Sequence, residues 1–104
     1  MFNLVVEEGN NNRNLYNIKE YSATLNDDNI SLVLSFTTSN DDEIKYLIHK
    51  DTRANDIKLI KKHLDEEYEK AVKDGIPYEI NEYPERHYIY VGNENLKQYT
   101  GIRI

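Results

Sequence analysis

Residues 30–50 read ISLVLSFTTSNDDEIKYLIHK, and this stretch decides the fold that we expect. Apolar and polar side chains alternate over residues 30–38 and again over residues 43–50, which is the period of strands with one buried face. The SNDD segment between them, residues 39–42, is rich in turn-forming residues. Because so short a turn joins antiparallel neighbours, the stretch predicts two strands of an antiparallel sheet.

Upstream of this stretch, residues 2–7 and 15–25 extend the same pattern. Turn-forming clusters at residues 9–14 and 26–29 separate the segments. Within the second segment the apolar side changes near Lys19, which predicts a β-bulge at that point. We therefore expect four strands in an antiparallel meander.

Downstream, the apolar period changes from 2 to 3.6 over residues 55–74, which predicts a long amphipathic helix. Asn55, or Asp51 and Thr52 slightly earlier, can cap its start, and Gly75 stands where a helix C-terminus favours glycine.

Further short strands are expected at residues 78–82 and 86–91. Residues 98–104 pair back on residues 86–91 as a hairpin or, in a competing interpretation, residues 93–99 form a short helix that Gly101 ends. The predicted fold class is therefore α+β. It comprises an antiparallel β-meander of about four strands, one long helix packed on the sheet, and two or three further short C-terminal strands in a single domain. The core is expected to contain Leu32, Leu34, Phe36, Ile44, Ile48, Ile60, Leu64 and Val72.

Composition and the lack of motifs exclude several classes of protein. The chain of 104 residues has no cysteine, so disulfides, thiolate nucleophiles and cysteine-based metal sites are absent. No apolar run approaches the length of a membrane span, and residues 2–6 lack the basic flank of a signal peptide. We expect a soluble, cytoplasmic protein without membrane contact. Phosphate-binding glycine loops and local metal motifs are missing, so we expect no cofactor and no metal.

The histidines do not form a local motif. His49, His63 and His87 fall on three separate predicted elements. His63 and Glu67 share one helix face at a spacing of four residues, which we interpret as a surface pair.

Charge gives the first indication of a partner. The net charge is −6, and residues 1–52 hold nine acidic and four basic residues, a net charge of −5. Such a field disfavours direct nucleic-acid binding and attracts a protein with a basic surface. The acidic candidates for partner binding lie in turns at both ends of one strand: Asp27, Asp28, Asp41, Asp42 and Glu43.

Tyrosines give the second indication. The segment from residue 83 to 90 reads YPERHYIY. If Ile89 faces the core, Tyr88 and Tyr90 point outward, and tyrosine and arginine are enriched at binding hot spots. We therefore add Tyr83, Arg86, Tyr88 and Tyr90 to the partner-binding residues.

Two classes of function remain. The first is a small acidic, non-enzymatic protein-binding module: an inhibitor, an immunity protein or a phage or mobile-element counter-defence protein that acts on a basic partner such as a nuclease. The second is a small-molecule binder or small enzyme whose site is assembled from scattered residues such as His49, His87 and Tyr90. We favour the first, and we leave a homodimer open. Asn, Ile, Lys and Tyr make up 42 of the 104 residues, and their AT-rich codons are in keeping with a low-GC bacterium or with a phage or mobile element that lives in one.

Overall fold

The computed structural model describes residues 1–52 and 56–104, and within these residues the chain forms a closed barrel of seven strands with one α-helix. The elements, in chain order, are β1 (Phe2–Glu8), β2 (Asn11–Leu25), β3 (Ser31–Thr38), β4 (Glu43–His49), α1 (Ile57–Asp74), β5 (Tyr78–Tyr83), the 3₁₀-helix η1 (Pro84–Arg86), β6 (Tyr88–Val91) and β7 (Lys97–Arg103).

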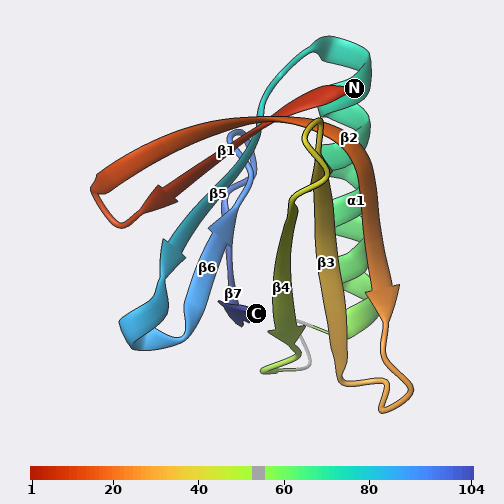
Figure 1. Cartoon of the computed structure of the whole chain (residues 1–104). Coiled ribbons are helices and arrows are strands. Elements are labelled where there is room, and N and C mark those ends of the chain that lie inside the picture. Colours follow the sequence, from red (N-terminus) through yellow and green to blue (C-terminus); the bar gives the residue numbers. More distant parts are fainter. Residues whose placement is uncertain (53–55) are drawn as a thin grey trace.

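The strands follow one another around the barrel in the order β1-β2-β3-β4-β7-β6-β5. Neighbours pair antiparallel except β1 and β5, which pair in parallel and close the ring. In Figure 1 the strands β5 and β6 lie on the left, β3 and β4 on the right, and β1 and β2 span the two sides, with α1 behind β2 and β3.

The predicted open meander with a helix on one face is therefore wrong. The four N-terminal strands do run antiparallel in chain order, but β7 adds to β4 and β5 adds to β1, so both edges of that sheet are taken. The reason is that the local pattern specifies only neighbours joined by short turns. Strands that precede α1 in the chain also pair with strands that follow it, and these pairings depend on the way the whole sheet curves.

The bend of β2 makes this closure possible. Its first half pairs with β1 and its second half with β3, and Ile18 has a partner in both ladders. The register shifts between Ile18 and Glu20, so the bulge predicted near Lys19 is confirmed. A bulge bends a strand and increases its twist, and here it keeps Ile18 and Ala23 both on the buried face.

Helix α1 begins and ends with specific caps. The Asp56 carboxylate accepts a hydrogen bond from the Lys58 amide at 2.9 Å, and Gly75 ends the helix in the left-handed conformation with φ of 67°. The predicted C-terminal glycine is confirmed. The start is capped by Asp56 rather than by Asp51 or Thr52, and the other expected cap, Asn55, lies outside the described residues.

The buried stripe of α1 differs from the predicted one at its C-terminal end. Ala71 is 4% exposed, whereas Val72, which we expected in the core, is 48% exposed. Each residue advances about 100° around a helix, and the stripe through Ile60, Leu64 and Glu67 continues to residue 71. Val72 therefore lies at the edge of the stripe. The other seven predicted core residues are buried.

At the C-terminal end, β7 pairs with β6. The hairpin interpretation is thus confirmed, and the competing helix at residues 93–99 is wrong. At the other end, the predicted turn at residues 9–14 is shorter than expected, because β2 already begins at Asn11. Among residues 1–52 and 56–104, no helix combines the length and the apolar character needed to cross a membrane.

Candidate functional site

Three tyrosines form a cluster on the outer wall of the barrel, and we call Tyr83, Tyr88 and Tyr90 the tyrosine cluster. Tyr83 ends β5 and stands directly opposite Tyr88 at the start of β6. The ring centroids lie 5.1 Å apart for Tyr83 and Tyr88, 5.5 Å for Tyr83 and Tyr90, and 5.4 Å for Tyr88 and Tyr90. All three side chains are partly exposed, while Ile89 and Val91 face the core.

The connection between β5 and β6 places Arg86 beside this cluster. Pro84–Arg86 form one 3₁₀ turn, and His87 reverses the chain with a φ of 57°. The Arg86 guanidinium donates a hydrogen bond to the Tyr88 hydroxyl at 3.3 Å. This contact is the main cause that raises the pKa of the exposed Arg86. The four residues predicted from the YPERHYIY segment therefore lie side by side.

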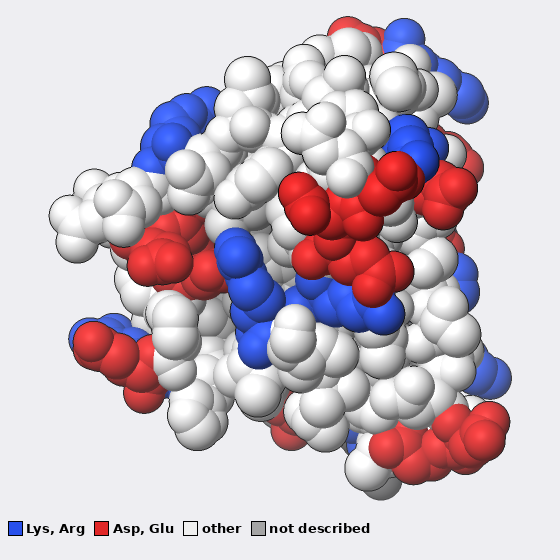
Figure 2. Space-filling model, in the orientation of Figure 1, with Lys and Arg blue, Asp and Glu red and all other residues white. Residues whose placement is uncertain are grey.

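The acidic candidates lie at opposite ends of β3, in two groups that do not meet. Asp27 and Asp28 belong to the turn before β3, and Asp41 and Asp42 to the turn after it. Figure 2 shows one acidic group at the centre right of this face with lysine or arginine atoms beside it, and another toward the lower right.

Asp28 has a structural role in its turn. Its carboxylate accepts hydrogen bonds from the backbone amides of Ile30 and Ser31 at 3.0 and 3.1 Å, and from the Ser31 hydroxyl at 2.9 Å. The bond from the Ile30 amide is the largest cause that holds the pKa of Asp28 below its usual range. Replacing Asp28 therefore removes bonds that fix the turn.

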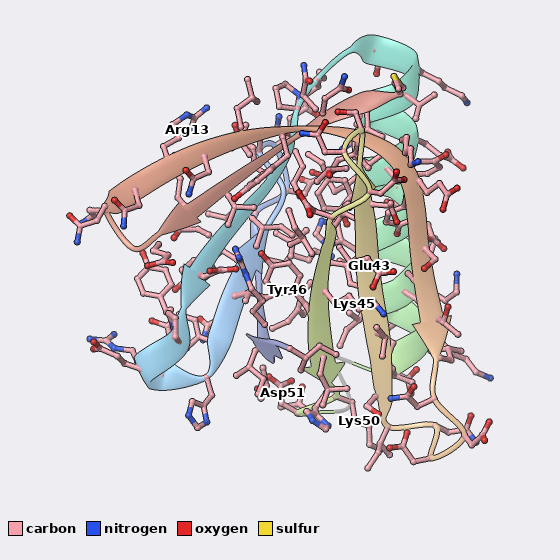
Figure 3. All side chains as sticks on the ribbon, viewed as in Figure 1. Arg13, Glu43, Lys45, Tyr46, Lys50 and Asp51 are labelled. Atoms are coloured by element: carbon pink, nitrogen blue, oxygen red, sulfur yellow. The ribbon has the colours of Figure 1, made fainter. Side chains whose placement is uncertain are left out.

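Ion pairs partly neutralise the second acidic group. Asp41 pairs with Lys19, and the Glu43 carboxylate lies 3.2 Å from the Lys45 ammonium. In Figure 3 the labelled Glu43 and Lys45 both project from β4. Within the described chain the side chains of Asp27 and Asp42 are exposed and have no ion-pair partner, so these two carry charge that a partner can meet.

The alternative interpretation groups His49, His87 and Tyr90, which lie at three places on the barrel. His49 is at the end of β4, opposite Thr100, whereas His87 is exposed after η1 and Tyr90 belongs to the tyrosine cluster. No hydrogen bond or ring contact joins any two of His49, His87 and Tyr90 in the part of the chain that the structure describes. The same part contains no group of three or more His, Cys, Asp or Glu side chains placed to hold a metal ion.

A polar group that consists of the buried Tyr46 and Glu82 and the partly exposed Arg103 was missed by the sequence analysis. The Tyr46 hydroxyl donates to the Glu82 carboxylate at 2.5 Å, and the Arg103 guanidinium donates to the same oxygen at 2.7 Å. Glu82 is 4% exposed and Tyr46 is fully buried, while the Arg103 guanidinium also lies 5.7 Å from the centre of the Tyr46 ring. Burial, followed by the bond to Glu82, raises the pKa of Tyr46. Figure 3 shows Tyr46 between β4 and the strands on the left.

A second buried polar group joins α1 to the barrel. His63 and Glu67 are both buried, so their interpretation as a surface pair is wrong. The Tyr99 hydroxyl and His63 Nδ1 lie 2.6 Å apart, and Glu67 accepts a hydrogen bond from the Asn93 amide at 3.3 Å. Burial lowers the pKa of His63, whose Nε2 atom is buried and has no hydrogen-bond partner among the described residues.

Neither buried group has a sequence signal of its own. Glu82 alternates with Ile80 and Tyr78 on the inner face of β5, and this position in the strand pattern was the only indication that it is buried. For His63 the indication was its place on the apolar stripe of α1.

Comparison of the chain with protein-family models, with curated proteins and with solved structures finds no match.

Proposed function

We propose that this chain is a small acidic, non-enzymatic protein-binding module that acts on a partner with a basic surface. In this proposal it serves as an inhibitor, immunity or counter-defence protein, with a nuclease as one example of the partner. The module acts in the cytoplasm, uses no cofactor, and binds neither nucleic acid nor membrane directly.

The tyrosine cluster is the observation that carries the proposal. Three partly exposed aromatic rings contact one another on the outer wall of the barrel, and an arginine lies beside them. Tyrosine brings a large, stiff and amphipathic surface to an interface at a low entropic cost. Tyrosine and arginine are also the residue types most enriched at hot spots.

Shape and charge add support. The inward side chains fill the barrel, and the largest fully buried ones include Tyr46, Tyr78, Tyr99 and Phe36. Such an interior leaves the outer wall as the surface for recognition. The net charge of −6 favours encounter with a basic partner.

The first test captures the partner from the native host and identifies it by mass spectrometry. The baits are the wild-type protein, the double variant Tyr88→Ala with Tyr90→Ala, and Leu59→Ala as a control. Leu59 is 55% exposed on α1 and does not belong to the tyrosine cluster. A hot-spot tyrosine contributes about 2 kcal/mol or more, so we expect the double variant to bind at least roughly 30-fold more weakly, mainly through faster dissociation. Equal affinity of the double variant and wild type would refute the proposal.

The second test concerns electrostatic steering. Asp27→Asn with Asp42→Asn removes two exposed charges and leaves the turn bonds of Asp28 intact. We expect a slower association with the identified partner at low salt and a weaker dependence on salt. The control is Glu66→Gln with Glu69→Gln on the exposed face of α1, which removes the same charge elsewhere. An unchanged association rate in the Asp variant would refute electrostatic steering and would mean that these two charges only keep the protein soluble.

A third test concerns nucleic acid. We expect no saturable binding of the isolated protein to duplex DNA in an anisotropy titration at physiological salt. Saturable binding there contradicts the proposed partner class.

A further inference from the structure

The two halves of β2 are covered in different ways. The strand pairs with β1 over Asn11–Ile18 and with β3 over Ile18–Leu25, so each half has one side without a neighbouring strand. Helix α1 lies beside the second half, where the Tyr21 hydroxyl donates to Asp65 at 2.8 Å and the Tyr21 ring stacks on Tyr68 with centroids 4.3 Å apart. In Figure 1 the first half reaches to the left with β1, away from β3 and α1.

We call the side of residues 11–17 that faces away from β1 the open edge of β2. The Asn17 carbonyl accepts a hydrogen bond from the Ser39 amide at 2.9 Å, so it points to this side. Alternate residues of an antiparallel strand direct their N–H and C=O groups to the same side, so the groups of Arg13 and Leu15 also point away from β1. Among the described residues no backbone hydrogen bond is made to them there.

This edge has few of the features that keep an exposed strand from pairing. Such strands are usually guarded by lysine, by proline or by a charge that points inward. Residues 11–17 read NNRNLYN, with no lysine and no proline, and the only charged residue, Arg13, pairs with Glu7 of β1. Leu15 is 67% exposed. Unpaired backbone groups beside an exposed apolar side chain are typical of an edge that accepts another strand.

We propose that the open edge of β2 pairs with the same edge of a second copy of this chain. The two strands run antiparallel about a two-fold axis at Asn14, which makes the interface the same patch on both copies. Arg13 of each copy then lies opposite Leu15 of the other, and the two residues exchange both N–H···O bonds. The two Asn14 residues meet at the axis, with Cα atoms about 4.5 Å apart and side-chain amides that both donate and accept.

Charge favours a second copy over a basic partner at this edge. In the proposed register each arginine faces an apolar leucine, and its methylene stem covers that leucine. The Arg13 guanidinium stays with the carboxylates of its own copy, since it pairs with Glu7 and lies 4.0 Å from Glu79. A strand from a basic protein would instead place its cations beside Arg13. A single strand pair buries less than the roughly 1,200 Å² of a small stable interface, so we expect a weak dimer.

The first test is sedimentation equilibrium of the full-length protein from about 10 µM to about 1 mM, a range suited to weak association. We expect a monomer at the low end and a growing dimer fraction at the high end. Leu15→Pro removes the N–H at the edge, where proline is tolerated, and is expected to weaken the dimer at least about fivefold. Leu15→Thr keeps this N–H and is the matched control, expected to weaken the dimer less. A monomer at every concentration, or equal association of the two variants, would overturn the proposal.

A second test does not depend on how well the proline variant folds. The chain has no cysteine, so a disulfide of a single-cysteine variant always joins two copies. Asn14→Cys places the two thiols opposite each other at a Cα separation that suits a disulfide. With oxidised glutathione as the oxidant, we expect this variant to cross-link at least about tenfold faster than Asn10→Cys in the neighbouring exposed turn. Equal rates would contradict the register.

These outcomes are independent of the proposed function, because the tyrosine cluster takes no part in the strand pair. If the wild type stays monomeric and Leu15→Pro loses the captured partner, a strand of that partner takes the edge and the second-copy proposal is wrong. If the protein dimerises as expected but the Tyr88→Ala and Tyr90→Ala double variant keeps the partner, only the proposed function fails.

Discussion

Inward and outward tyrosines of the same barrel wall are held in different ways. Tyr46, Tyr78 and Tyr99 point into the barrel, and each has a polar partner for its hydroxyl: Glu82, the carbonyl oxygen of Leu64, and His63. Tyr83, Tyr88 and Tyr90 point outward and contact one another.

The difference explains the polar residues of the core. A buried tyrosine hydroxyl needs a hydrogen-bond partner, so a barrel that uses tyrosine to fill its interior also buries polar groups. Glu82 and His63 supply two of those partners. The outward hydroxyl groups need no buried partner, because the three side chains are partly exposed and water reaches them.

The largest expected difference between the inward and the outward tyrosines is the loss of unfolding free energy when the ring is removed. Tyr78→Ala is expected to cost about 3–5 kcal/mol of unfolding free energy, because its ring contacts Phe2, Tyr21 and Phe36 in the core. Tyr90→Ala is expected to cost less than about 1 kcal/mol. Urea unfolding followed by circular dichroism measures both. Similar midpoints for the two variants would contradict the comparison.

A smaller effect isolates the hydroxyl groups. Tyr46→Phe removes a donor from the buried Glu82 carboxylate and is expected to cost about 1–3 kcal/mol. Tyr88→Phe removes an exposed hydroxyl and its long hydrogen bond from Arg86 and is expected to stay within about 0.5 kcal/mol of wild type. The same urea experiment applies. A neutral Tyr46→Phe variant would show that Arg103 alone satisfies Glu82.

The smallest effect is a dependence on pH through His63, the partner of Tyr99. Burial lowers the pKa of His63 in the folded state, whereas in the unfolded chain the pKa is near the ordinary value of 6.5. As the pH falls below that value, the unfolded chain takes up a proton that the folded chain does not, so the unfolding free energy falls. The effect of one group is at most about 1.4 kcal/mol per pH unit.

The measurement compares wild type and His63→Gln between pH 7 and pH 5. Glu66, Glu67, Lys70 and Lys97 also act on His63 electrostatically, and they are present in both proteins. We expect the variant to lose less stability over this interval. Parallel pH profiles would indicate that the loss comes from other groups.

Local features of the fold were readable from the sequence. The bulge after Ile18, the C-terminal cap at Gly75 and the inward position of Ile89 each depend on residues close together in the chain. The bend of β2 was thus predicted, but its consequence, the closure of the sheet, was not. Closure requires β5 to pair with β1, which lies some seventy residues earlier in the chain. The alternation of apolar and polar residues within a strand does not specify so distant a partner.

The candidate site and the open edge of β2 show the same division. The outward direction of Tyr88 and Tyr90 followed from the period of one strand. The open edge depends on where β3 and α1 lie, so no single stretch reveals it. The burial of Glu82 was missed and that of His63 was misjudged, because charged or titratable residues are usually exposed and the burial of these two depends on tyrosines elsewhere in the chain.

The parallel pairing of β1 with β5 also bears on how the chain is made. Synthesis proceeds from the N-terminus, so the residues of β1 to β4 are made before those of β5, β6 and β7. Without the last three strands β1 and β4 would be the edges of the sheet, and open edges with unpaired backbone groups are templates for aggregation. Arrival of the last three strands removes both edges at once. The C-terminal quarter of the chain therefore covers both edges that the four N-terminal strands alone leave open.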